Sequence, residues 1–191
     1  MDTIDPMSAT RTRVLRATSA HGVAEPLRLD RLDTPLGRMM VLADSKALHL
    51  AEFTDRKALD RQVARVRRMA DRPVTPGRTK VTEAFADELA RYFAGELRTF
   101  ATPVVLHGTA FQLRVWAGLH ALPYGATASY AEVAERIGSP RAVRAAASGN
   151  AANALAIIVP CHRIVPKAGG VGGYAGGAAR KAWLLRHEAK G

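Results

Sequence analysis

The spacing of apolar residues divides the chain into a strand-rich first half and a helix-rich second half. Between Leu27 and Phe53, apolar residues fall at nearly every second position, and turn sequences at residues 34–37 and 44–46 interrupt them. Alternation of this kind predicts short strands with one buried face. Because the connections are short, we expect the strands to pair antiparallel in a small sheet.

Helical spacing replaces the alternation further along the first half. Apolar residues three and four positions apart predict one helix over about residues 57–70 and another that begins near Val81. Residues 71–80 between them contain prolines and a glycine and are expected to form a loop. Strands and helices together predict an N-terminal α/β unit over residues 27–102.

The remaining residues fall into three segments. Residues 1–26 are small and polar with interspersed arginines, and we expect them to form a flexible basic tail. Residues 103–108 are the predicted linker, and residues 109–191 change to a helical composition. The sequence therefore predicts an α+β fold, in which a small α/β domain precedes a mainly helical one.

Helix start signals are clear in the second half. Thr109 with Gln112, and Ser129 with Glu132, each fit a capping box, in which two side chains satisfy free backbone amides reciprocally. The second of these helices is expected to end at Gly138. Two helices are therefore predicted to begin directly after Thr109 and Ser129.

A third helix is predicted directly after the glycine. Ser139 can cap it, Pro140 suits its first position, and Gly149-Asn150 would end it after about Ser148. Two short helices joined in this way resemble a helix-turn-helix. The third helix sets Arg141 and Arg144 among alanines, so that it is either a smooth surface that approaches a nucleic-acid backbone closely or a tightly packed core helix.

Charge is unevenly distributed along the 191 residues. The chain carries 28 Lys and Arg against 17 Asp and Glu, and residues 109–191 alone hold ten basic residues against three acidic ones. A concentrated positive field favours a polyanionic partner, with nucleic acid as the first candidate and an anionic membrane as the second. A merely soluble basic protein is the remaining alternative. At 48% hydrophobic residues the chain can build a core and is not a disordered one.

Two further features bear on the compartment. The sequence contains no apolar run of membrane-spanning length and no apolar segment typical of a signal peptide. Its single cysteine excludes a disulfide within the chain and a cysteine-rich zinc site, and it suits a reducing compartment. We therefore expect a cytoplasmic protein without membrane association.

That single cysteine, Cys161, is the strongest candidate for chemistry. It follows an apolar stretch from Ala154 to Val159 that is predicted to be a strand, and His162 follows it directly. A thiol beside an imidazole is a candidate nucleophile with a base, although a small buried apolar residue is the alternative. A glycine-rich loop around Tyr174 lies further along the chain and would let the backbone approach a ligand closely.

Several short stretches occur in an order and spacing that belong together: Gly108-Thr109-Ala110-Phe111-Gln112, Val115-Trp116, Pro123-Tyr124-Gly125, Ser129-Tyr130, Ala142-Val143-Arg144-Ala145, Pro160-Cys161-His162-Arg163, Gly173-Tyr174 and Lys181-Ala182-Trp183-Leu184-Leu185. With these stretches the chain resembles the O6-alkylguanine-DNA alkyltransferases, also called methylated-DNA–protein-cysteine methyltransferases. The resemblance runs from residue 36 to residue 188 and is strongest from residue 108 onward.

The resemblance implies a fold and a reaction. Its fold is a ribonuclease-H-like N-terminal domain followed by a C-terminal domain with a helix-turn-helix. Family members bind double-stranded DNA through the minor groove, rotate the damaged nucleotide out of the helix and transfer the alkyl group from guanine O6 to their own cysteine, once per molecule. No cofactor and no metal are expected, since the cysteines of the structural zinc site found in some relatives are absent here. We expect a monomer in solution.

The resemblance also assigns the acceptor chemistry. Cys161 would be the acceptor, and Glu188, His162 and a water molecule would form the relay that ionises it. Asn153 matches the asparagine that organises the turn around the site. A carboxylate behind an imidazole fixes its tautomer and orientation, as in a serine triad.

Substrate contacts are implied by position as well. Tyr174 would donate a proton or a hydrogen bond toward the leaving guanine, and the backbone amide of Ala175 would face O6. The carbonyls of Cys161 and Ile164 would accept from the exocyclic amine, with Lys181 in a supporting role.

On the DNA side, Arg144 matches the arginine that fills the gap left by the flipped base, and Tyr130 matches the tyrosine that pushes the adjacent phosphate. Ser139 and Arg141 are the further expected DNA contacts. Small residues around Arg144 suit this role, because bulky ones would hold the helix out of a narrow minor groove.

Three alternatives are weighed against this interpretation. A DNA-binding lesion sensor without transfer activity would lack a nucleophile, and Cys161 argues against it. A cysteine hydrolase or redox protein would ignore DNA, and the positive charge with Arg144 argues against that. A transcriptional switch would need an additional metal-binding acceptor domain, for which the sequence has no segment.

Overall fold

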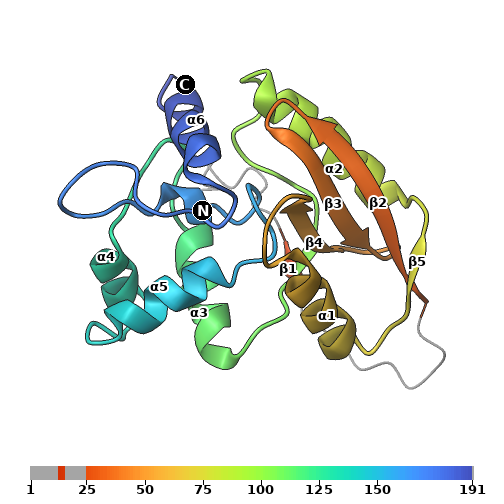
Figure 1. Cartoon of the computed structure of the whole chain (residues 1–191), viewed down its shortest axis with the longest axis horizontal. Coiled ribbons are helices and arrows are strands. Elements are labelled where there is room, and N and C mark those ends of the chain that lie inside the picture. Colours follow the sequence, from red (N-terminus) through yellow and green to blue (C-terminus); the bar gives the residue numbers. More distant parts are fainter. Residues whose placement is uncertain (1–12, 16–24, 191) are drawn as a thin grey trace, which may run out of the picture.

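A six-stranded mixed sheet forms the centre of the first half (Figure 1). The computed structural model describes residues 13–15 and 25–190. In spatial order the strands are β1-β6-β4-β3-β2-β5. Their bounds are β1 (Val14–Leu15), β2 (Leu27–Thr34), β3 (Gly37–Ala43), β4 (Leu48–Phe53), β5 (Val74–Pro76) and β6 (Val104–Val105).

The predicted antiparallel strands are confirmed, and three short strands add to them. β2 pairs with β3 and β3 with β4, both antiparallel. β5 lies inside the predicted loop and runs parallel to β2, while β6 lies inside the predicted linker and pairs in parallel with β1 and β4. Strands of two or three residues are too short to show alternation, so the sequence pattern did not reveal them. β1 falls within the predicted tail, of which the structure describes only residues 13–15 and 25–26.

Two helices cover opposite faces of this sheet (Figure 1). Helix α1 (Leu59–Ala70) begins two residues later than predicted, and α2 (Lys80–Phe93) covers the second predicted helix. Successive residues of β3 point to opposite faces of the sheet, and both faces are buried. Leu42 packs in the hydrophobic cluster that includes α1, and its neighbour Val41 packs in the cluster that includes α2. The first half is therefore a layered α/β unit, as expected.

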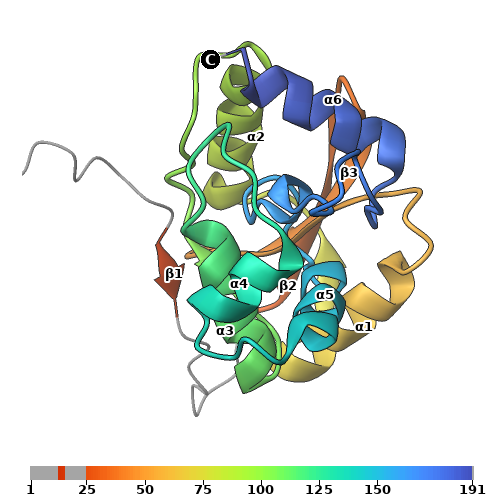
Figure 2. The same cartoon turned by 90° about the vertical axis from the view of Figure 1, so that its left-hand side faces the viewer.

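The second half is mainly helical. Its elements are α3 (Ala110–His120), α4 (Tyr130–Arg136), α5 (Val143–Ala151), the short 3₁₀ helix η1 (Cys161–Arg163) and α6 (Ala178–Glu188). Both predicted capping boxes are confirmed, with reciprocal hydrogen bonds at the starts of α3 and α4. Figure 2 shows α4 and α5 as neighbouring helices that lie in front of α3.

Helix α5 differs from its predicted bounds. Ser139 does not cap it: the Ser139 carbonyl accepts a turn hydrogen bond from the Ala142 amide at 2.9 Å, and the helix starts only at Val143. Gly149 lies inside the helix rather than ending it. Its missing side chain has a packing reason, because a Cβ there would lie 3.1 Å from the Val115 side chain of α3. The glycine therefore permits close approach of two helices.

The predicted strand from Ala154 to Val159 is wrong. This stretch is buried but forms turns, with Ile157 at a left-handed φ of 70°, and only a single bridge joins Leu155 to Ala51 of β4. An apolar run buried on all sides looks the same in sequence whether it is extended or folded back. The bridge ties the chain just before Cys161 to the N-terminal sheet.

Candidate active site

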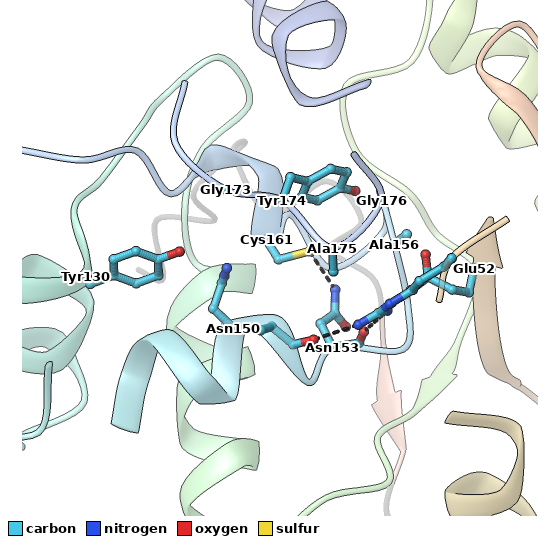
Figure 3. Close-up of a pocket in the computed structure, with 12 residues that line it drawn as sticks. Glu52, Tyr130, Asn150, Asn153, Ala156, Cys161, Gly173, Tyr174, Ala175 and Gly176 are labelled. Atoms are coloured by element: carbon cyan, nitrogen blue, oxygen red, sulfur yellow. Dashed lines mark hydrogen bonds and ion pairs between the residues drawn. The ribbon is translucent and has the colours of Figure 1, made fainter. Parts of the chain in front are cut away.

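A cavity of about 300 Å³ lies where the two halves of the molecule meet (Figure 3). It brings together five of the residues singled out from the sequence, namely Cys161, Tyr174, Ala175, Asn153 and Tyr130. The other lining residues are Glu52, Arg56, Asn150, Ala151, Ala156, Gly173 and Gly176.

Cys161 is the first residue of η1 and is only 6% exposed. Its Sγ accepts a hydrogen bond of 3.1 Å from Nδ2 of Asn153. The same amide donates to the Val159 carbonyl at 3.0 Å, and its oxygen accepts from the Leu155 amide at 3.0 Å, so that the Asn153 side chain holds the turn in shape. Burial raises the pKa of Cys161 to about 11, and the bond from Asn153 opposes that rise. The resting thiol is thus protonated near neutral pH, and ionising it requires a base.

His162 is completely buried next to the thiol and contacts a carboxylate. Its Nε2 lies 2.9 Å from Oε1 of Glu188. Because an ionised carboxylate only accepts hydrogen bonds, this contact places the proton on Nε2 and leaves Nδ1 as an acceptor. Nδ1 is buried and has no hydrogen-bond partner in the described part of the chain. Burial lowers the pKa of His162, which favours the neutral imidazole that a base requires.

Glu188 is buried and receives several hydrogen bonds. Besides His162, Arg163 donates to it from Nε at 2.7 Å and from Nη2 at 3.0 Å, and the Tyr92 hydroxyl donates at 2.8 Å. Burial alone would raise the pKa of Glu188, but the hydrogen bonds from His162 and Arg163 outweigh it and hold the pKa well below its usual range. Glu188 therefore stays ionised and keeps His162 in one tautomer.

Helix α6 and the glycine-rich loop supply the rest of the wall. Lys181 is buried and donates from Nζ to the carbonyls of Ile164 at 2.5 Å and Gly173 at 3.1 Å. These bonds fasten the glycine-rich loop to the residue that follows η1. The Ile164 carbonyl, expected to accept from the substrate, thus already accepts from Lys181 and retains one lone pair.

Tyr174 points its ring into the cavity from the loop (Figure 3). Its hydroxyl is buried, although the residue as a whole is only partly so, and it has no hydrogen-bond partner among the described residues. Burial raises the pKa of Tyr174 well above its ordinary value, so the hydroxyl keeps its proton and can donate. Ala175 beside it is exposed.

The expected DNA contacts lie mostly outside the cavity. Arg144 and Arg141 are exposed at the start of α5 and just before it, and Ser139 is half-buried in the turn that follows α4. Of this group only Tyr130, the first residue of α4, lines the cavity (Figure 3). The two exposed arginines on the helix pair therefore lie outside the cavity, whereas Tyr130 belongs both to the helix pair and to the cavity wall.

Two charged residues of the cavity wall, Glu52 and Arg56, were not expected from the sequence. Glu52 lies on β4, every residue of which is buried, and its side chain pairs with Arg56 four residues later. Both side chains are at least 95% buried. A carboxylate in a mainly apolar strand was the available signal, because such groups are almost never buried without a partner.

Two kinds of feature are absent from residues 13–15 and 25–190. None of their helices is long and apolar enough to span a membrane. These residues also contain no group of three or more histidine, cysteine or acidic side chains arranged to hold a metal ion.

Two protein-family models match the chain, one for each half. Residues 27–106 match the ribonuclease-like domain of 6-O-methylguanine DNA methyltransferase, and residues 110–190 match its DNA binding domain.

Curated relatives and solved structures agree with these matches. The chain is 46% identical over 160 residues to a methylated-DNA–protein-cysteine methyltransferase of Mycobacterium leprae, covering 82% of this chain and 89% of the relative. It is 37% identical over 166 residues to the protein of the same name from Shigella flexneri, covering 83% and 94%. The crystal structure of Mycobacterium tuberculosis OGT in complex with DNA superposes with a TM-score of 0.73 at 36% identity, covering 85% of this chain and 93% of that one.

Proposed function

The chain belongs to the methylated-DNA–protein-cysteine methyltransferase family, which repairs O6-methylguanine in DNA, and we propose that Cys161 is the residue that receives the methyl group, once per molecule. The observation that carries this proposal is the position of Sγ. It lies in the wall of a cavity and accepts a hydrogen bond from Asn153, and the next residue in the chain is His162, which pairs with Glu188.

The proposed transfer is a single displacement. The Cys161 thiolate attacks the methyl carbon, the new S–C bond forms as the C–O6 bond breaks, and the electron pair of the broken bond stays with the purine. Guanine needs a proton at N1 to become neutral, and the proton lost by the thiol balances it. A thioether has no ready leaving group, so the protein is expected to stop after one reaction.

His162 is proposed as the base that takes the thiol proton. Its Nδ1 is free to accept, because Nε2 is engaged by Glu188. No hydrogen bond joins the imidazole to Sγ within residues 25–190, so we propose that a water molecule carries the proton between them. The imidazolium that forms is stabilised by ionised Glu188, as the acid stabilises histidine in a serine triad.

The glycine-rich loop is proposed to hold the base. Tyr174 would donate its hydrogen bond toward the purine, because its buried hydroxyl keeps its proton and has no described partner. The Ala175 amide would face O6, and the carbonyls of Cys161 and Ile164 would accept from the exocyclic amine. Lys181 would act indirectly by tying the loop to Ile164.

The protein binds DNA, and we propose that it does so on duplexes through the minor groove, as a monomer in the cytoplasm. Arg144 would enter the base stack in place of the flipped nucleotide, whose extrusion takes a few kcal/mol. Tyr130 would press on the neighbouring phosphate, and Arg141 and Ser139 would contact the backbone. Exposure of both arginines on the helix pair supports these roles. Arg144→Ala should therefore weaken binding to the lesion-containing duplex and slow methyl transfer. If neither changes, Arg144 does not take the place of the flipped nucleotide.

A non-catalytic sensor of the same fold is the alternative, and the Cys161 thiol separates the two. The test is to incubate the protein with excess duplex that contains O6-methylguanine and to count the methyl groups removed. We expect about one per protein, followed by a halt, while Cys161→Ser should bind the duplex and remove none. Continued turnover by the wild-type protein would reject self-methylation, and removal of none would favour the sensor.

A further inference from the structure

The C-terminal end of α5 is held by side chains of the other domain. Arg56, in the turn between β4 and α1, donates from Nη2 to the Ala151 carbonyl at 2.6 Å and from Nη1 to the Asn153 carbonyl at 2.8 Å. Glu52 pairs with the same guanidinium from β4. One planar cation therefore joins the N-terminal sheet to two carbonyls in the wall of the acceptor cavity.

Helix α1 holds the carbonyl between those two. Arg65 donates from Nη2 to the Ala152 carbonyl at 2.8 Å, and Gln62 donates from Nε2 to the same oxygen at 3.3 Å. The last carbonyls of a helix have no partner within it, and cations are favourable at that end. Three consecutive carbonyls at the end of α5 are thus satisfied by the N-terminal domain.

The position of this segment matters because Asn153 ends it. The backbone of Asn153 accepts from Arg56, and its side-chain amide donates to Cys161 Sγ at 3.1 Å. Figure 3 shows Glu52, Asn153 and Cys161 along one side of the cavity. A shift of the Asn153 backbone would therefore move the donor away from the sulfur.

We propose that Arg56, oriented by Glu52, is a positioning residue for the acceptor thiol: by fixing the carbonyls of Ala151 and Asn153, it keeps the Asn153 amide on Sγ. The N-terminal domain then contributes to methyl transfer without touching the DNA. This inference rests on the proposed role of Cys161 as the acceptor and names a part of the chain that the reaction scheme leaves unused.

The variants must separate positioning from folding. Arg56→Met alone would leave Glu52 buried without its partner, which is strongly destabilising. The double variant Glu52→Gln/Arg56→Met removes both charges together and keeps the side-chain volumes close to the original. Arg56→Lys keeps the charge but replaces the planar fork with a point charge, so it cannot reach both carbonyls in the same way. Arg67→Met, an exposed arginine on α1, is the matched control.

The first readout is the rate constant of methyl transfer at saturating duplex, measured beside the dissociation constant for the same duplex. We expect the double variant to react about tenfold more slowly, which is the loss of roughly one hydrogen bond in the transition state. Arg56→Lys should fall between it and the wild type, and DNA affinity should change by less than about twofold. Arg67→Met should match the wild type.

The second readout needs no DNA: the pH dependence of Cys161 alkylation by iodoacetamide. Asn153 lowers the pKa of Cys161, Glu52 raises it, and Arg56 lowers it by less than Glu52 raises it. Removing both charges would thus lower the pKa of the thiol, whereas losing the Asn153 bond would raise it. The two effects have opposite signs, and positioning predicts a rise.

A slower reaction at saturating duplex together with a raised thiol pKa supports the inference. A folded double variant that transfers methyl at the wild-type rate, one whose thiol pKa falls, or one that loses only DNA affinity would overturn it. If the wild-type protein itself transferred no methyl group, the proposed function would fail, yet the alkylation profile would still decide whether Arg56 positions Asn153.

Discussion

Two buried carboxylates differ in their environments: Glu52 lines the cavity with Cys161, and Glu188 pairs with His162, the next residue in the chain. Glu188 lies on the C-terminal side and accepts hydrogen bonds from His162, Arg163 and Tyr92. Glu52 lies on the N-terminal side and has Arg56 and one backbone amide as partners. Burial raises the pKa of Glu52 more than Arg56 lowers it, whereas the donors around Glu188 outweigh burial and lower its pKa.

The number of donors, rather than the presence of one arginine, therefore sets the charge of a buried acid. Glu188 keeps a full charge and can stabilise an imidazolium at His162. Glu52 has fewer donors, and its guanidinium partner is shared with backbone carbonyls. We therefore assign proton transfer to the C-terminal side of the thiol and positioning to the N-terminal side.

The largest expected effect comes from Glu188→Gln. The new amide can donate to His162 Nε2, which would move the imidazole proton to Nδ1 and remove the base. General-base catalysis contributes about 10²–10⁴-fold, so single-turnover methyl transfer should slow by at least about 100-fold. Glu135→Gln, on the exposed side of α4, is the control and should react normally. A near-normal rate for Glu188→Gln would show that Glu188 is not needed for proton transfer, and the difference in role assigned to the two carboxylates would be wrong.

Arg163→Met should have the next largest effect, on stability. Arg163 is buried and donates to Glu188 and to the Leu122 carbonyl. Removing one partner of a buried pair typically lowers the free energy of unfolding by about 3–5 kcal/mol. Urea denaturation at pH 7 would measure this loss, with the exposed Arg136→Met as its reference. A loss below 1 kcal/mol would mean that the other donors suffice for Glu188.

The smallest expected effect is on the pH dependence of stability. It separates the two acids clearly, because their contributions to the free energy of unfolding should change with pH in opposite directions. The pKa of Glu188 is lowered on folding, so its stabilisation is present above its unfolded pKa of about 4.3 and is lost as the pH falls through the folded value. The pKa of Glu52 is raised on folding, so the contribution of Glu52 to stability is largest below its unfolded pKa of about 4.3 and falls as the pH rises from there through the folded value.

Unfolding free energies between pH 3.5 and 7 would test these signs. The stability of the wild type relative to Glu188→Gln should increase as the pH rises, and its stability relative to Glu52→Gln should decrease. Two slopes of the same sign would show that the two carboxylates do not differ in the way inferred from their donors.

Local rules predicted much of this structure. The capping boxes at Thr109 and Ser129 act within three residues, and both are present. Alternation in the first half marked β2 to β4 for the same reason, since each strand repeats its pattern over six or more residues. The acceptor motif gave Cys161 and His162 together, because they are adjacent in the chain.

The missed features depend on contacts between distant parts of the chain. Arg56 and Asn153 are 97 positions apart, and nothing near either residue encodes their hydrogen bond. The turns from Ala154 to Val159 are shaped by the Asn153 side chain and by Ala51 of the sheet, so the apolar run alone read as a strand. Tertiary contacts decided these elements.

A peptide mass spectrum would show whether the sulfur of Cys161 takes the alkyl group. The wild-type protein would be incubated with duplex containing O6-methylguanine, digested, and analysed for the peptide that carries Cys161. We predict one added methyl group on Cys161 in proportion to the lesion removed, and none in the Cys161→Ser protein. Lesion repair with an unmodified Cys161, or a methyl group on another residue, would contradict it.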